Sequence, residues 1–264
     1  KNLIFICNGG GRVDKRLKLF LGIIVLIITV TGCAVNTEAP GEKGKEIISA
    51  KKALNELSKE GVVLVDTRKS TPYEKKHIKG AVNISRNDIT TFGPFPNMLA
   101  SSGKVEKTLG EKGITNDTKV IAYDDNNNMD AARLWWTLKV YGHENVRVVS
   151  GGWEAMLDAG AETTTEIPEF SKVKYQIKEK NEEMIASKEE VKSEGNMPQD
   201  DVVLLDVRSQ KEYNRGTIPD SIHFNYVNNN YPDGTYRPVR QIHTLYKDKG
   251  IKPDKTVIMY CKTS

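Results

Sequence analysis

Cysteine is scarce in this sequence, which has three in 264 residues: Cys7, Cys33 and Cys261. The first two lie in a leading segment that we expect outside the folded part. No internal disulfide is therefore expected, and stability must come from hydrophobic cores. A chain of this length can form two domains, each with a core of its own.

Histidine is equally scarce, and its spacing excludes the common metal sites. None of the four histidines stands at a distance from another that is typical of metal-ligand pairs. We therefore predict no resident metal and no cofactor. The four are His77, His143, His223 and His243.

The excess of positive charge is confined to the start of the chain. Residues 1–32 carry five basic side chains and one acidic one, and residues 33–264 carry 34 of each sign. The net charge of +4 therefore belongs to the leading segment. It gives no support to nucleic-acid binding.

The apolar run at residues 19–30 is too short to span a bilayer comfortably, which takes about 20 residues. A basic stretch at residues 15–18 precedes it, and small residues lead from it to Cys33. This pattern is typical of a secretory signal peptide. The cysteine directly after Thr31 and Gly32 resembles the lipobox of bacterial lipoproteins.

The lipobox resemblance implies cleavage before Cys33 and a lipid on its sulfur. The protein would then be extracytoplasmic and lipid-anchored to the bacterial cell membrane. Residues 1–32 would be upstream residues and signal peptide, with translation starting at Val13, and residues 33–46 a flexible tether. The alternative is a plain membrane anchor with an incidental cysteine.

An internal repeat organises the rest of the chain. Residues 62–68 match residues 202–208 without a gap at an offset of 140. Residues 113–124 match residues 250–261 at an offset of 137. Two blocks in the same order at nearly one spacing indicate a duplicated domain.

Each copy alternates short apolar runs with helical patterns. Continuous apolar runs predict buried strands, and apolar residues at helical spacing predict helices. Alternating strands and helices predict a mostly parallel sheet covered on both faces. The expected strands of the first copy are 62–65, 82–84, 120–123 and 146–149, and its expected helices are 47–57 and 131–141.

Cys261 directly follows an expected strand at residues 256–260. In open parallel sheets, sites form beyond the carboxyl ends of the strands. A loop there can direct several backbone N–H groups at one point, which stabilises a thiolate and binds an anion. Cys261 is therefore a candidate nucleophile; a structural cysteine at a strand end is the alternative.

The motifs around Cys261 follow a recognisable order. An Asp-x-Arg triplet after a buried strand is followed by a tyrosine and by a turn before a second strand. The first copy repeats the triplet and adds two long motifs. These segments are 206–208, 213 and 216–221 in the second copy, and 66–68, 131–136 and 142–153 in the first.

These motifs resemble the tandem rhodanese family of thiosulfate and 3-mercaptopyruvate sulfurtransferases. The resemblance implies an α/β fold with two rhodanese-like domains, each a mostly parallel sheet with helices on both faces. The implied bounds are 47–158 for an inactive first domain, 159–171 for a linker and 172–264 for a catalytic second domain. We call the two domains the first and second copy.

The resemblance also implies a mechanism, in which the Cys261 thiolate takes sulfane sulfur from thiosulfate, or from 3-mercaptopyruvate, as a persulfide. Cyanide or a thiol then accepts that sulfur. Lys262, Thr263 and Ser264 would bind the anionic substrate. Asp206 and Arg208 would support the site.

The first copy should be catalytically inactive, because Asp124 occupies the position of Cys261 and a carboxylate cannot accept a sulfane sulfur. We expect it to contribute an interdomain face and a wall of the cleft.

Two features depart from the family pattern. Glu212 is acidic where some members have a basic residue. The printed chain ends at Ser264, before the arginine and helix that close the family's loop, so we expect an incomplete second domain with weak or no activity.

Three alternatives stay open: a persulfide carrier or redox-sensing lipoprotein, a non-catalytic binding module, and a rhodanese-like phosphatase or arsenate reductase.

Overall fold

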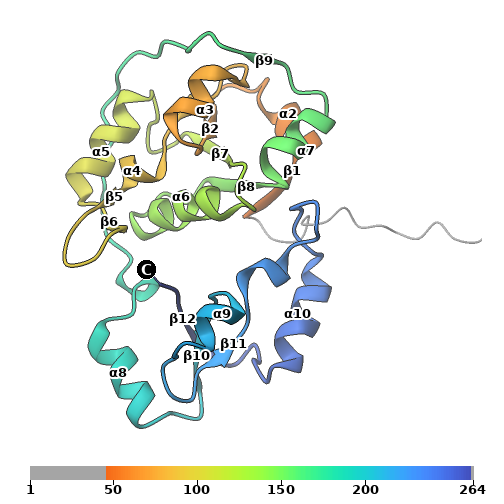
Figure 1. Ribbon diagram of the computed structural model, residues 1–264. Coiled ribbons are helices and arrows are strands. Elements are labelled where there is room, and N and C mark those ends of the chain that lie inside the picture. The colour runs from red at the N-terminus through yellow and green to blue at the C-terminus, as the bar shows by residue number, and fades with distance from the viewer. Residues whose placement is uncertain (1–45, 263–264) are drawn as a thin grey trace, which may run out of the picture. The chain divides into compact units, whose positions relative to one another are not determined.

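A computed structural model describes residues 46–262 of the chain (Figure 1). The expected signal peptide, the lipid-attachment residue Cys33 and almost all of the tether lie outside the described residues, as do Thr263 and Ser264. Among the described residues, no helix combines the length and apolar character needed to cross a membrane.

The first copy is built on a five-stranded parallel sheet in the order β1-β8-β7-β2-β4. This arrangement confirms the predicted α/β fold with a parallel sheet. The strands are β1 (Ile47–Ser49), β2 (Val62–Asp66), β4 (Val82–Asn83), β7 (Lys119–Tyr123) and β8 (Val146–Ser150).

Helices cover both faces of this sheet, because successive side chains of each strand point to opposite sides. On one face, Val120 and Ala122 of β7 pack with residues of α4, α5 and α6. On the other, Ile121 and Tyr123 pack with residues of α2 and α7. The helices are α2 (Ala50–Glu56), α4 (Arg86–Ile89), α5 (Ser102–Glu111), α6 (Met129–Val140) and α7 (Gly152–Asp158).

Short elements connect these layers. Helix α3 follows β2, and two small antiparallel pairs, β3 with β9 and β5 with β6, lie outside the main sheet. Their bounds are α3 (Ser70–Lys75), β3 (His77–Ile78), β5 (Thr90–Thr91), β6 (Met98–Leu99) and β9 (Thr163–Thr164).

The start of the first copy differs from the sequence prediction. A helix was expected over residues 47–57, but residues 47–49 form strand β1, which pairs with β8. The helix begins only at Ala50, where the Ser49 side chain accepts a hydrogen bond from Lys52 N and caps it. Sheet pairing, which periodicity does not detect, determines this boundary.

The second copy repeats the centre of the first sheet as a three-stranded parallel sheet in the order β11-β10-β12. The register is the same in both copies: Asp206 is paired with Tyr260, as Asp66 is with Tyr123. The elements are α8 (Lys188–Asn196), β10 (Val202–Asp206), α9 (Gln210–Tyr213), β11 (Ile222–His223), α10 (Val239–Asp248) and β12 (Thr256–Tyr260), with 3-10 turns η1 (Glu182–Met184) and η2 (Tyr226–Asn229).

Strand β12 is less covered than its counterpart β7. Met259 of β12 is 62% exposed, whereas the matching Ala122 of β7 is fully buried between β2 and β8. Within the described residues, β12 pairs on one side only, with β10. Cys261 is accordingly exposed.

Two segments outside the first copy's predicted bounds pack against it. Tyr175 is buried in its core and its hydroxyl lies 3.0 Å from Nδ1 of His143. Further along, Tyr236 packs on the same core, and its backbone N donates to Ser150 Oγ at 2.9 Å. The first regular helix of the second copy begins only at Lys188.

Candidate active site

Cys261 lies directly after β12, at the carboxyl edge of the second sheet. The backbone carbonyl of Tyr260 accepts from Val207 N at 3.2 Å, so the loops after β10 and β12 lie side by side. Cys261, Asp206 and Arg208 therefore share one edge, where open parallel sheets form their sites.

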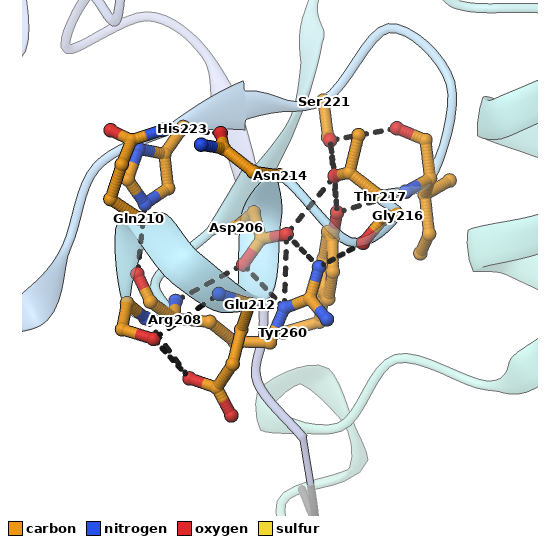
Figure 2. A network of polar contacts seen from close by, with 12 residues as sticks. Asp206, Arg208, Gln210, Glu212, Asn214, Gly216, Thr217, Ser221, His223 and Tyr260 are labelled. Carbon is orange, nitrogen blue, oxygen red and sulfur yellow. Dashed lines mark hydrogen bonds and ion pairs between the residues drawn. The ribbon is translucent and has the colours of Figure 1, made fainter.

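Asp206 and Arg208 form a bidentate ion pair at this edge (Figure 2). Arg208 Nε lies 2.9 Å from Oδ1 and Nη2 lies 2.5 Å from Oδ2 of a carboxylate that is fully buried. Arg208 Nη2 also donates to the carbonyl of Gly216 at 2.7 Å. The pair thus joins the loop after β10 to the turn before β11.

Three hydroxyl groups complete this network, as Figure 2 shows. Thr217 Oγ1 donates to Asp206 Oδ2 at 3.0 Å and lies 2.7 Å from the Tyr260 hydroxyl. The Tyr260 hydroxyl donates to Ser221 Oγ at 2.9 Å and accepts from Ile218 N at 3.2 Å. The residue immediately before Cys261 is therefore held at both its backbone and its side chain.

Burial of Asp206 acts to raise its pKa, but the hydrogen bonds from Arg208 and Thr217 prevail and hold it below the usual range. Asp206 consequently stays ionised, and its oxygens are engaged by the protein itself. The contacts of Asp206 and Arg208 are those of residues that hold the loops in place.

The first copy contains a similar ion pair, but its tyrosine bonds directly to the carboxylate. Arg68 Nη2 lies 2.7 Å from Asp66 Oδ2, and the Tyr123 hydroxyl donates to the same oxygen at 2.6 Å. The similarity extends to the backbone carbonyl of the arginine in each copy. In the first copy, the carbonyl of Arg68 accepts a hydrogen bond from Asn83 Nδ2 at 2.8 Å. In the second copy, His223 Nε2 lies 2.8 Å from the carbonyl of Arg208.

Asp124 shows what the loop after the central strand can hold. Its side-chain oxygens accept four backbone N–H bonds of 2.7–2.9 Å, from Asn126, Asn128, Asp130 and Ala131. Burial raises the pKa of Asp124, and the backbone hydrogen bonds act in the opposite direction. The loop into α6 is therefore an anion cradle that its own carboxylate fills.

A glycine makes room for this loop. Gly152 has φ of +52°, and a Cβ atom at this position would lie 2.1 Å from the backbone oxygen of Asp124. Both the left-handed conformation and the close approach require glycine here. The same backbone oxygen accepts from Trp153 N at 2.7 Å, which ties the loop to α7.

Of the predicted substrate-binding residues, only Lys262 lies within the described part of the chain, where it is exposed beside Cys261. Its charge acts on Glu212, whose pKa is lowered mainly by hydrogen bonds from Ser209 and to a smaller extent by Lys262. Glu212 forms a capping box with Ser209 at the start of α9. Its carboxylate is thus part of a helix cap.

Tyr260 and Thr217 also support the site, although neither was among its predicted residues. The repeat contained a signal for the first, since Tyr123 and Tyr260 directly precede Asp124 and Cys261. No sequence pattern indicated that Thr217 would reach Asp206.

The model of the family described as "Rhodanese-like domain" matches residues 49–159 and 187–264. The chain therefore belongs to the rhodanese family and carries two rhodanese-like domains in tandem. The predicted family and fold class are confirmed.

Curated relatives agree with this family. A "Putative thiosulfate sulfurtransferase" of Saccharopolyspora erythraea is 31% identical over 237 residues, which cover 82% of this chain and 81% of that protein. The "Sulfur carrier protein TtuD" of Thermus thermophilus is 29% identical over 208 residues, 72% of each chain. Together with the family, such relatives support sulfurtransferase activity with a sulfur donor and a sulfur acceptor.

A solved structure shows the same fold. The crystal structure of SseA from Escherichia coli, described as a 3-mercaptopyruvate sulfotransferase with the rhodanese fold, superposes with a TM-score of 0.72 at 20% identity. The match covers 81% of this chain and 87% of that one.

The Asp206 network generates a stability prediction. Asp206→Asn should lower the free energy of unfolding near neutral pH by about 1–3 kcal/mol, because the donors around it lose a charged acceptor. Since the folded-state pKa lies below the unfolded value of about 3.9, this stabilisation is fully present above that pH and declines as the pH falls below it. Urea unfolding of wild type and variant at about pH 7 and about pH 3 measures the difference.

Asp248→Asn, at an exposed carboxylate at the end of α10, is the matched control and should change stability little at either pH. An equal loss for Asp206→Asn at both pH values would contradict the assigned ionisation.

Proposed function

We propose that the chain is a thiosulfate sulfurtransferase that carries sulfur as a persulfide on Cys261. The observation that carries the proposal is the register shared by the two copies. Cys261 directly follows Tyr260, as Asp124 directly follows Tyr123. In the first copy, four backbone N–H groups converge on the Asp124 carboxylate at this position. A loop of this kind suits a thiolate, a persulfide and an anionic donor.

The reaction proceeds in two displacements. The Cys261 thiolate attacks the outer sulfur of thiosulfate, a new S–S bond forms, and the S–S bond of thiosulfate breaks with its electron pair leaving on sulfite. An acceptor, cyanide or a thiolate, then attacks the outer sulfur of the persulfide. That step releases thiocyanate or a new persulfide and restores the Cys261 thiolate.

Neighbouring residues have distinct tasks in this scheme. Lys262 attracts the donor with its exposed charge, and Thr263 and Ser264 add hydroxyl donors to the loop. Asp206 and Arg208 hold the loops in register without contacting the substrate. Asp124 fills its own cradle and keeps the first copy inactive.

Protein expressed from the complete gene should produce thiocyanate from thiosulfate and cyanide, and Cys261→Ser should reduce the rate to background. Met259→Ser, which changes an exposed side chain of the same strand, is the matched control and should retain turnover. Equal rates for Cys261→Ser and wild type would exclude the proposed nucleophile.

A second function, persulfide carrier, is favoured by the relative named as a sulfur carrier protein. In this case thiosulfate loads Cys261 with one sulfur, but small acceptors remove it slowly and a partner protein removes it quickly. Intact-mass measurement distinguishes the two. A carrier retains the added sulfur atom after cyanide is supplied, whereas an enzyme loses it and turns over.

Lys262 provides a prediction on donor binding. Lys262→Gln should raise the KM for thiosulfate about two- to fivefold with little change in kcat, because an exposed charge contributes up to about 1 kcal/mol to an anion contact. Steady-state kinetics at several ionic strengths measures this, and the difference should shrink as salt increases. Lys249→Gln, at an exposed position after α10, is the control; an equal effect there would remove Lys262 from the site.

We also propose that the protein is lipid-anchored through Cys33 on the extracytoplasmic side of a bacterial membrane. The support is the sequence pattern of a basic stretch, a short apolar run and a cysteine after small residues. Cys33→Ser should abolish incorporation of labelled fatty acid and release the protein from the membrane fraction. Asn36→Ser, three residues further along in the expected tether, is the matched control and should change neither; labelling that persists in Cys33→Ser would refute the lipid site.

A further inference from the structure

Arg133 is a charged residue of the first copy for which residues 46–262 supply no carboxylate partner. It lies on α6, and its Nη2 donates to the backbone carbonyl of Asn97 at 2.6 Å. Its guanidinium carbon lies 4.9 Å from the ring centre of Trp136. Its Nε is buried and has no hydrogen-bond partner within the described residues.

The surroundings of Arg133 disfavour an uncompensated positive charge. Burial lowers the pKa of Arg133, and the like charge of Arg86 lowers it further, whereas the charge of Cys261 raises it. Arg86 has a carboxylate of its own, with Nε 2.6 Å from Asp130 Oδ1. Among the ion pairs of residues 46–262, none includes Arg133.

Contacts along the chain bring this face of α6 to the second copy. Trp136 Nε1 donates to the carbonyl of Met184 in η1, close before α8, at 3.2 Å. Asn128, just before α6, donates through Nδ2 to the carbonyl of Gly234 at 2.7 Å. Helix α6 is thus contacted by one segment of the second copy that precedes β10 and by another that follows it.

We propose that Arg133 of the first copy supplies positive charge to the Cys261 site and favours anionic reagents there. The inference rests on the proposed function for the identity of the donor, thiosulfate, but not for the charge itself. A guanidinium suits this task because its planar N–H groups match the oxygens of an oxyanion. The buried Nε is one donor that such an anion would satisfy.

The proposal gives the first copy a part in the chemistry, although Asp124 prevents it from carrying sulfur. One copy supplies the nucleophile, and the other supplies a cation held by Asn97 and Trp136. A purely structural Arg133 would instead act through these two contacts alone, and its loss would affect charged and neutral reagents alike.

Two alkylating reagents separate these possibilities. Iodoacetate is anionic and iodoacetamide is neutral, but both transfer a small substituted methyl group to a thiolate. The ratio of their rates at Cys261, measured on the Cys261 peptide by mass spectrometry, reports the local potential and requires no sulfurtransferase turnover. Arg133→Gln should lower the iodoacetate-to-iodoacetamide ratio about three- to tenfold, as expected for loss of one nearby charge.

Two further variants control for effects of packing and of overall charge. Arg133→Lys keeps the charge and should keep the ratio within about twofold of wild type. Lys139→Gln removes one positive charge from the same helix, at a residue that pairs with Glu144, and should leave the ratio unchanged. An unchanged ratio in Arg133→Gln, or equal loss of both rates, would overturn the proposal.

Turnover separates this inference from the proposed function. If wild type transfers sulfur from thiosulfate, Arg133→Gln should raise the KM for thiosulfate more than it lowers kcat. A wild type without thiosulfate turnover, combined with the expected fall in the reagent ratio, would refute the donor but retain Arg133. Turnover with an unchanged ratio would refute Arg133 and retain the donor.

Discussion

The parallel register that pairs Asp206 with Tyr260 is the constraint on which the rest of this site depends. It sets the loops after β10 and β12 side by side, so that a single buried carboxylate can hold Arg208 and, through Thr217, the tyrosine before Cys261. A shift of one residue would turn each side chain of the strand to the opposite face. The Tyr260 hydroxyl would then no longer meet Thr217.

Duplication shows, in the first copy, what the loop after the central strand can bind. The backbone groups after β7 converge on an anion, and Asp124 provides one within the chain. A carboxylate in that position satisfies the donors permanently, whereas a thiolate is an anion that can also accept and release sulfur. The two copies thus share the strand register that leads into this loop and differ in the residue that follows the strand.

The first copy, which we expect to be inactive, also binds segments that lie outside it. Its core accepts Tyr175 and Tyr236 from outside its own predicted bounds, which ties the chain on either side of α8 and β10 to it. Its helix α6 also carries Arg133, a cation without a carboxylate partner among the described residues, which we propose acts on the Cys261 site. A domain that has no nucleophile can still contribute charge to an active site.

The sequence by itself determined the family, the two copies and the candidate nucleophile. Repeated blocks at nearly one spacing indicated duplication, and continuous apolar runs indicated buried parallel strands. The contrast between Asp124 and Cys261 at equivalent positions predicted which copy is inactive and which is reactive. These features are local in sequence or repeated in it, and composition and spacing record them directly.

Only the tertiary structure decided which distant residues meet. Residues 47–49 pair with β8 as a strand although their periodicity favours a helix, because a sheet edge supplies hydrogen bonds that no local pattern encodes. Thr217 reaches Asp206, and Trp136 of α6 reaches Met184, across separations that carry no sequence signature. Sequence patterns identify the nucleophile and its strand, whereas the charges and hydroxyl groups around it depend on how remote segments pack.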